Sequence, residues 1–205
     1  MNYVFKSLVG IFFLSIVTLS GCTKQAEIAH EPEDNKSPLS TIQSMKIYLK
    51  IEDLRDLQER ERVGVNKLKT GMNVGSVKLN QKVITICYDA LKNEFINNGH
   101  QILDGTDSNP DVVIKIGLKK FWGEAWARDY GLEVIGTINA EIAVIDPQND
   151  AELFSKPITA TVTRKEFTMV YGRAVERVLN ETLVEFIRNF SRDPGILKAL
   201  SNAKK

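Results

Sequence analysis

The stretch that decides the fold is residues 111–146, DVVIKIGLKKFWGEAWARDYGLEVIGTINAEIAVID. Apolar and polar residues alternate along it on both sides of a turn near residues 128–131, and this period of two is that of β-strands with one buried face. The inward-facing positions of the first run are Val112, Ile114, Ile116 and Leu118, continued in phase by Trp122 and Trp126. Those of the second run are Val134, Ile138, Ala140, Ile142 and Val144. We therefore predict a long β-hairpin as the main feature of the fold.

Further strands are predicted on both sides of this hairpin. Residues 45–51 alternate cleanly, residues 101–103 form a short strand, and residues 153–167 form a third long strand. Pro157 indicates an edge position or a bulge near the start of that strand, because proline cannot donate a backbone hydrogen bond. Residues 53–79 carry charged residues and then glycines, and a loop of this length inside a compact domain is either functional or mobile.

Two amphipathic helices complete the predicted fold. Apolar residues recur at helical spacing over residues 80–98, which Gly99 ends, and again over residues 169–190. Asp193-Pro194 is typical of the N-cap and first position of a last short helix. The order β-α-β-β-β-β-α predicts an α+β fold, with a mostly antiparallel sheet of three to five strands and both long helices packed on one face.

The N-terminus carries a pattern of protein export. A positive residue precedes an apolar segment at residues 8–19, which is too short to span a bilayer as a mature helix. The sequence LSGC at residues 19–22 resembles a bacterial lipobox, and this resemblance implies cleavage between Gly21 and Cys22 and acylation of Cys22. Thr23, in place of an Asp, then implies the outer membrane, facing the periplasm. An ordinary signal peptide or an uncleaved anchor is the alternative.

The sequence thus predicts a signal peptide at residues 1–21, a lipidated N-terminus and flexible tether at residues 22–44, and a single periplasmic domain at residues 45–205. The chain has 205 residues, 43% of them hydrophobic, which is enough for one packed core. Its 27 Lys and Arg nearly balance its 26 Asp and Glu, so nucleic acid is not expected as a partner. With Cys22 acylated, Cys87 has no disulfide partner and is expected to be a buried, inert thiol.

Residues with catalytic potential are scarce. The two histidines are His30, in the predicted tether, and His100, directly after the first helix. No CxxC, HExxH, G-x-S-x-G or phosphate-loop pattern occurs, so the sequence predicts neither an enzyme nor a cofactor or metal site. The acidic residues are scattered, and a glycosidase-like carboxylate pair stays open as an alternative.

The end of the hairpin is the main candidate for binding a partner. It gathers residues of the kinds that anchor interfaces: Phe121, Trp122, Trp126, Arg128 and Tyr130. The first strand would be about 55 Å long at about 3.3 Å per residue, whereas the second helix covers about 30 Å at about 1.5 Å per residue. Unless the hairpin bends at a glycine, its tip overhangs the helices and exposes the tryptophans. In the alternative, the tryptophans pack under the helices or the glycine-rich loop.

The start of the charged loop is a second candidate, at Asp53, Arg55 and Asp56. These residues would form a recognition loop on a rigid scaffold. The alternative is a solvated turn with local Asp–Arg pairing, which contributes little to stability.

The chain resembles the YajG-type lipoproteins of Gram-negative bacteria over nearly the whole domain. The resemblance rests on DLR at residues 53–55 followed by Val63-Gly64, on NNGH at residues 97–100, and on DVVI at residues 111–114 leading to Phe121-Trp122. It implies an outer-membrane-anchored periplasmic domain of α+β type, and it brings no catalytic residues.

Two functions are expected from these patterns. The first is a non-enzymatic accessory lipoprotein that docks an envelope protein through the hairpin end and an exposed strand edge. The second is a binding module for a small or lipidic envelope ligand, in a cavity between helices and sheet that Phe95, Phe186 and Phe190 would line.

Overall fold

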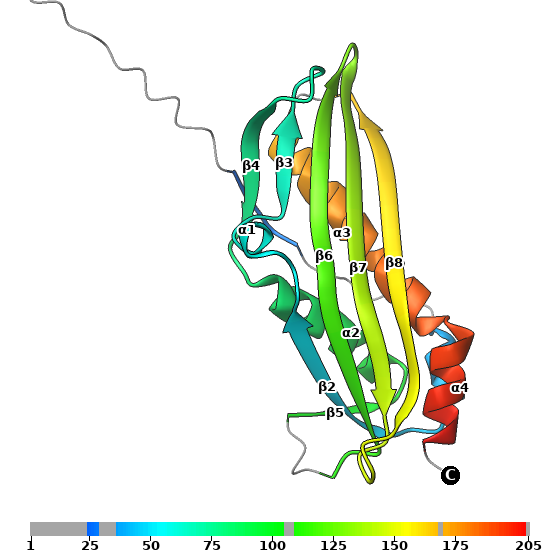
Figure 1. Cartoon of the computed structure of the whole chain (residues 1–205). Coiled ribbons are helices and arrows are strands. Elements are labelled where there is room, and N and C mark those ends of the chain that lie inside the picture. Colours follow the sequence, from blue (N-terminus) through cyan, green and yellow to red (C-terminus); the bar gives the residue numbers. More distant parts are fainter. Residues whose placement is uncertain (1–23, 29–35, 105–108, 168–169, 204–205) are drawn as a thin grey trace, which may run out of the picture.

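A mixed β-sheet carries its two long helices, α2 and α3, on one face (Figure 1). The structure, a computed structural model, describes residues 24–28, 36–104, 109–167 and 170–203. The strands are β1 (Lys24–Ala26), β2 (Lys46–Asp53), β3 (Gly64–Lys67), β4 (Asn73–Leu79), β5 (Gln101–Leu103), β6 (Val112–Arg128), β7 (Gly131–Ile145) and β8 (Glu152–Glu166). The helices are the 3₁₀ helix η1 (Pro38–Thr41), α1 (Leu57–Arg60), α2 (Val83–Asn97), α3 (Tyr171–Ser191) and α4 (Pro194–Asn202).

Strand β6 holds the sheet together. One edge of β6 pairs antiparallel with β7, and β7 pairs antiparallel with β8 at the edge of the sheet. The other edge of β6 pairs in parallel with β2 over residues 112–118 and with β3 over residues 123–126. β4 pairs antiparallel with β3, while β1 joins β4 and β5 joins β2, both in parallel. The fold is α+β, but the predicted order and the mostly antiparallel sheet of three to five strands are wrong, since the described sheet is mixed and has eight strands.

The missed strands lie within residues 53–79, which were predicted as a loop. β3 has four residues and β4 has seven, with glycines in both, so neither shows the alternation of a strand. These strands exist because their backbone groups pair with β6 and with each other, and pairing of this kind is decided by tertiary context rather than local propensity.

The predicted helices correspond to α2 and α3, and a capped last helix follows them. The Asp193 carboxylate accepts hydrogen bonds from the backbone N–H groups of Gly195 and Ile196, at 2.8 and 3.1 Å. This is the N-cap that the sequence predicts for α4, with Pro194 at its first position. Pro157 lies in β8, whose outer edge is unpaired in the described sheet, as a proline requires.

A β-bulge reverses the facing of side chains halfway along β6. The pairing with β7 shifts between Leu118 and Lys120. Before the shift the even-numbered residues, such as Ile116, face the helices, and after it the odd-numbered ones, such as Phe121, do so. One extra residue sends every later side chain to the other face. Trp122 therefore lies opposite the helices, and the prediction that it continues the inward phase of Ile116 is wrong.

Residues predicted as a flexible tether are partly built into the fold. Lys24–Ala26 pairs with β4, and Ala26 and Ile28 are 3% and 4% exposed. Leu39, in η1, is fully buried in the core. The structure thus differs from the predicted tether over residues 24–28 and 36–44, because burial of these apolar side chains offsets the entropy lost on ordering the chain. The predicted signal peptide and Cys22 lie outside the described residues.

Helix α3 contacts the hairpin closely at two facing glycines. Gly123 of β6 pairs with Gly136 of β7. A Cβ added at Gly123 would lie 2.7 Å from Cγ1 of Val175, and one added at Gly136 would lie 2.3 Å from Oγ1 of Thr182. The two glycines therefore let the helix backbone approach the sheet.

We expect Gly136→Ala to lower the free energy of unfolding by about 1–3 kcal/mol, because the added methyl group overpacks the contact with α3. Urea denaturation followed by circular dichroism measures this change. Thr137→Ala, one residue along and on the opposite face, is the matched control and should change stability by less than about 0.5 kcal/mol. Equal effects of the two substitutions would contradict the close helix contact.

Candidate functional site

The sheet face opposite the helices is mostly polar, as expected of a sheet with one solvated face. Lys115 and Thr161 are typical of its residues, and Asn139 donates a hydrogen bond to Thr159 Oγ1 across two strands. The exception is the second half of β6, where Trp122, Glu124 and Trp126 follow one another on this face. We call these three residues the indole row.

Glu124 connects the two indole rings. Trp122 Nε1 lies 3.3 Å from Glu124 Oε1, and Trp126 Nε1 lies 3.1 Å from Oε2. Lys67 Nζ, on the neighbouring strand β3, donates to the same Oε2 at 3.0 Å. Burial raises the pKa of Glu124, but the hydrogen bonds from Lys67 and the indoles and the charge of Lys67 more than compensate, so its pKa lies below the ordinary 4.5.

Cationic side chains cover the two rings. Lys67 Nζ lies 4.3 Å from the centroid of the Trp126 ring, and Arg128 Cζ lies 5.5 Å from it. Arg62 Cζ lies 5.7 Å from the centroid of the Trp122 ring. Such contacts contribute about 0.5–1 kcal/mol each at exposed sites and more when desolvated. The tryptophans are thus covered by the segment 53–79, which is one of the alternatives that the sequence left open.

The predicted partner-binding residues therefore divide into two groups. Phe121 is fully buried against the helices, Trp122 is only 8% exposed, and Trp126 is half-buried. Arg128 and Tyr130 are exposed at the hairpin tip, where Arg128 pairs with Glu133 on the returning strand. A partner-binding role for these residues stays a prediction, and only the second group offers an open surface.

The hairpin tip carries a second exposed aromatic residue that sequence reasoning missed. Tyr130 is 89% exposed and Phe167, directly after β8, is 90% exposed. Both line one groove of about 370 Å³, together with Arg128, Leu132 and Lys165. The Phe167 backbone lies beside the hairpin turn because Leu132 pairs with Glu166. Only this register, which the sequence does not show, would have identified Phe167.

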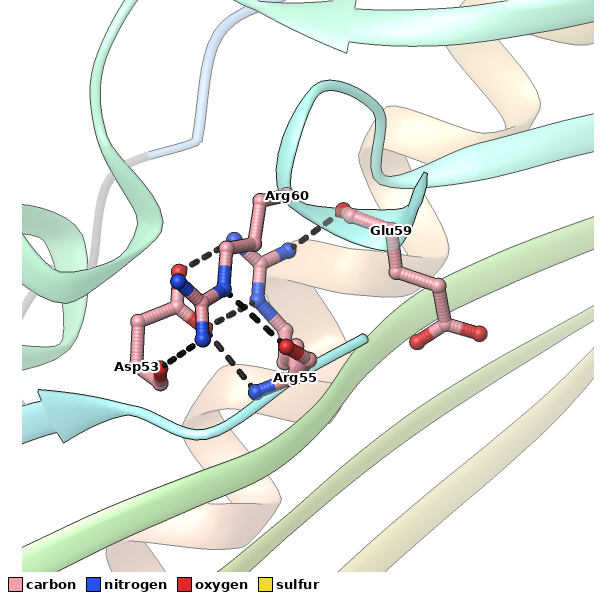
Figure 2. Close-up of polar contacts among 4 residues, drawn as sticks. All are labelled: Asp53, Arg55, Glu59 and Arg60. Carbon is pink, nitrogen blue, oxygen red and sulfur yellow. Dashed lines mark hydrogen bonds and ion pairs between the residues drawn. The ribbon is translucent and has the colours of Figure 1, made fainter. Parts of the chain in front are cut away.

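The charged loop after β2 is an ordered cluster rather than a solvated turn (Figure 2). Arg55 is 3% exposed, and its Nε and Nη2 donate to the two carboxylate oxygens of Asp53 at 2.9 and 2.8 Å. Its Nη1 donates to the backbone carbonyl of Glu59 at 3.0 Å. Arg60 donates to the carbonyls of Arg55 and Asp53, at 3.0 and 2.8 Å. Arg55 and Arg60 thus hold the loop in place through hydrogen bonds to its carboxylate and backbone carbonyls.

The structure brings one residue of each sequence-predicted site, Asp56 and Trp122, to one pocket. Asp56, which precedes α1, lines a pocket of about 520 Å³ with Leu57, Arg62 and Trp122. The backbone carbonyl of Asp56 accepts hydrogen bonds from the first turn of α1, while its side chain is exposed. Tyr130 lies elsewhere, at the tip of the hairpin, and does not line this pocket.

The buried polar groups elsewhere have structural surroundings. His100 is 5% exposed, with Nε2 3.1 Å from the carbonyl oxygen of Leu39 and its ring edge-on to Phe95. Cys87 is 1% exposed, and burial raises the pKa of its thiol to about 12, as expected of an inert thiol. No group of three or more potential metal ligands gathers in the described part of the chain.

The interior offers no support for a ligand cavity at the predicted phenylalanines. Phe95, Phe186 and Phe190 are at most 1% exposed, and the rings of Phe95 and Phe190 pack edge-to-face with centroids 5.7 Å apart. These rings fill the core.

No helix within the described ranges is long and apolar enough to cross a membrane.

Comparison with known proteins identifies the fold and no family. No family model matches the chain, and no curated protein matches it. Among solved structures, a Xanthomonas campestris protein of family DUF330 is similar with a TM-score of 0.59 at 12% identity, over 86% of this chain and 96% of that one. This similarity shows that the fold occurs in a DUF330 protein, while the resemblance to YajG-type lipoproteins stays a prediction.

Two more distant structures are described as lipoproteins. One is a minor lipoprotein from Acinetobacter baumannii, with a TM-score of 0.39 at 12% identity over 73% of this chain and 92% of that one. The other is a lipoprotein from Neisseria meningitidis, with a TM-score of 0.32 at 11% identity over 66% and 96% of the two chains.

We expect Asp53→Asn to lower the free energy of unfolding at pH 7 by about 3–5 kcal/mol, because it leaves the Arg55 charge buried without a counter-ion. Burial raises the pKa of Asp53, but Arg55 and Arg60 bring it below the ordinary 3.8. The ionised carboxylate therefore stabilises the fold above its unfolded-state pKa, and this contribution is lost as the pH falls through the lower folded-state pKa.

Urea denaturation from pH 7 down to pH 2 tests this expectation, and the difference between wild type and Asp53→Asn should shrink only in the acid range. Glu59→Gln is the matched control, because Glu59 contributes its backbone carbonyl to the cluster. A pH-independent difference would show that the carboxylate charge of Asp53 is not the stabilising group.

We expect Glu124→Ala to lower the free energy of unfolding by about 1–3 kcal/mol, because two indole N–H groups and Lys67 lose their acceptor. Tryptophan fluorescence should change in the folded state as well. Glu141→Ala is the control, because Glu141 makes an exposed ion pair with Lys119 whose loss costs at most about 1 kcal/mol. Unchanged fluorescence with Glu124→Ala would contradict the indole contacts.

Proposed function

We propose that this chain is a non-enzymatic lipoprotein of the outer membrane that faces the periplasm and docks a protein partner with the tip of its β6–β7 hairpin. Anchoring would use acyl chains on Cys22, as the lipobox-like LSGC implies. The observation that carries docking is the pair of aromatic side chains at the tip, Tyr130 and Phe167, which are 89% and 90% exposed.

Such a pair is unusual on a protein that works alone. Single exposed apolar residues are common, but Tyr130 and Phe167 line the same groove, and aromatic residues dominate the binding energy of interfaces. Arg128, Asp129 and Lys165 surround the two rings with charge, which is the arrangement of an apolar centre with a polar rim.

The tip is also held rigidly before any partner arrives. The pairing of β6 with β7 continues to Arg128 and Gly131, and that of β7 with β8 reaches Leu132 and Glu166. Lys69 of the neighbouring β3–β4 turn adds an ion pair with Asp129 at 2.6 Å. A pre-ordered binding surface loses less conformational entropy on association, which supports docking at this end.

The proposed envelope location rests on the sequence of the N-terminus. The LSGC pattern supports lipidation, and Thr23 supports the outer membrane. For a small or lipidic ligand, the filled core around Phe95 gives no support, so protein docking is the proposed function.

We expect the double substitution Tyr130→Ser and Phe167→Ser to reduce crosslinked recovery of a partner from cell envelopes by about tenfold or more, as loss of central aromatic anchors does. The lipidated protein is recovered by affinity and its crosslinked partners are identified by mass spectrometry. The fold should stay intact, because both side chains are almost fully exposed.

The matched control is Ile96→Ser with Leu153→Ser, which removes two exposed apolar side chains, 48% and 39% exposed, at the other end of the sheet. This control should recover the partner as wild type does. If both double variants recover the same partners in the same amounts, the hairpin tip is not the docking site.

A further inference from the structure

A cavity with an excess of positive charge lies between the charged loop and the start of α2. Its volume is about 220 Å³. Four cationic side chains and two acidic ones line it: Arg55, Arg60, Arg62 and Lys82 against Asp53 and Glu61. Two positive charges are therefore left over within a small space.

The hydrogen bonds of the cluster show which cations are committed. Arg55 uses its three nitrogen atoms on the Asp53 carboxylate and the Glu59 carbonyl, as Figure 2 shows. This pairing also neutralises Asp53. Arg60 uses Nε and Nη2 on backbone carbonyls, so its Nη1 remains for a ligand. Glu61 and Lys82 are both exposed to solvent, where their charges are screened.

Arg62 carries a hydrogen-bond donor that is not satisfied. Its Nε is buried and has no hydrogen-bond partner in the structure. A buried donor without an acceptor costs free energy, and in folded proteins such a group often marks the place of an ion, a water or a ligand. Arg62 lines this cavity, and its guanidinium also lies over the Trp122 ring, which lines the neighbouring pocket of about 520 Å³.

The N-terminus of α2 adds backbone donors to the same cavity. Gln81, Lys82, Val83 and Ile84 all line it. Lys82 occupies the N-cap position, no side chain caps the helix, and no acidic residue stands in its first turn. The helix has 15 residues, so its first N–H groups carry the partial positive charge that attracts anions.

We propose that this cavity binds a phosphate group, with Arg62, Lys82 and the Nη1 of Arg60 as its charged donors. Guanidinium groups match the oxygen spacing of phosphate, and the free N–H groups at a helix N-terminus bind anions. The phosphate belongs either to inorganic phosphate or to a phospholipid headgroup. The site is separate from the hairpin tip and does not depend on docking there.

Isothermal titration calorimetry of the full chain in detergent tests the proposal, with inorganic phosphate and glycerophosphoglycerol as the two probes. Arg62→Gln combined with Lys82→Gln should weaken binding by about tenfold or more, because two charge-assisted contacts are lost. The exposed Lys82→Gln alone should weaken it less and leaves the stacking of Arg62 on Trp122 untouched. Arg173→Gln with Lys120→Gln, two exposed cations outside the cavity, should bind as wild type does.

Binding of either probe that is lost with the cavity variant and kept by the control supports the site. Tighter binding of glycerophosphoglycerol identifies a lipid headgroup as the source, and tighter binding of inorganic phosphate identifies the free anion. The proposal is overturned if neither probe binds, if the cavity variant binds like wild type, or if acetate, titrated as a control anion, competes as well as phosphate.

Discussion

The structure depends on one strand, β6, sharing a single edge with two strands that follow each other in the chain. β2 pairs with it as far as Leu118, and β3 begins to pair at Gly123. The backbone closes the gap with two hydrogen bonds, from Leu54 N–H to the Leu118 carbonyl and from Gly123 N–H to the Val63 carbonyl. The bulge in β6 falls in this interval, so the reversal of its facing and the insertion of the charged loop occur at the same place.

The gap between β2 and β3 along β6 explains both the charged loop and the contact of Arg62 with Trp122. The chain leaves the sheet at Asp53 and returns to it at Gly64. Backbone carbonyls of this segment have no partner on a neighbouring strand, and Arg55 and Arg60 donate hydrogen bonds to them. The bulge meanwhile turns Trp122 outward, where Arg62 covers it. A buried ion pair of the Arg55 kind gives little net stability, but it fixes one arrangement of the loop, because any other would leave a charge buried alone.

The sequence shows the parts of this fold that are locally encoded. Neighbouring residues determine the alternation around Ile116 and Ile142, the helical period of α2 and α3, and the Asp193 cap. All of these appear in the structure. β3, β4 and β1 could not be predicted, because they form by pairing with strands distant in the chain. The bulge at Leu118 leaves the sequence pattern almost unchanged, yet it decides the face on which Trp122 lies.

The candidate sites divide in the same way. Asp53 and Arg55 are predicted from opposite charges close in the sequence, and Tyr130 from the aromatic cluster at the hairpin end, and both patterns are local. Phe167, Arg62 and the contribution of Lys82 to one cavity depend on strand register and on the approach of α2 to the loop. Such contacts come from tertiary packing, and the residue periods of strands and helices, two and 3.6, do not reveal them.

Strand β1 has a consequence for how far the protein could reach. Only Thr23 separates Cys22 from Lys24, where the sheet begins, and two residues of extended chain span at most about 7 Å. Acyl chains on Cys22, as proposed, would therefore keep the start of β1 close to the lipid headgroups. A short link of this kind would restrict the volume that the domain explores, and so raise its effective concentration toward a partner held at the same membrane.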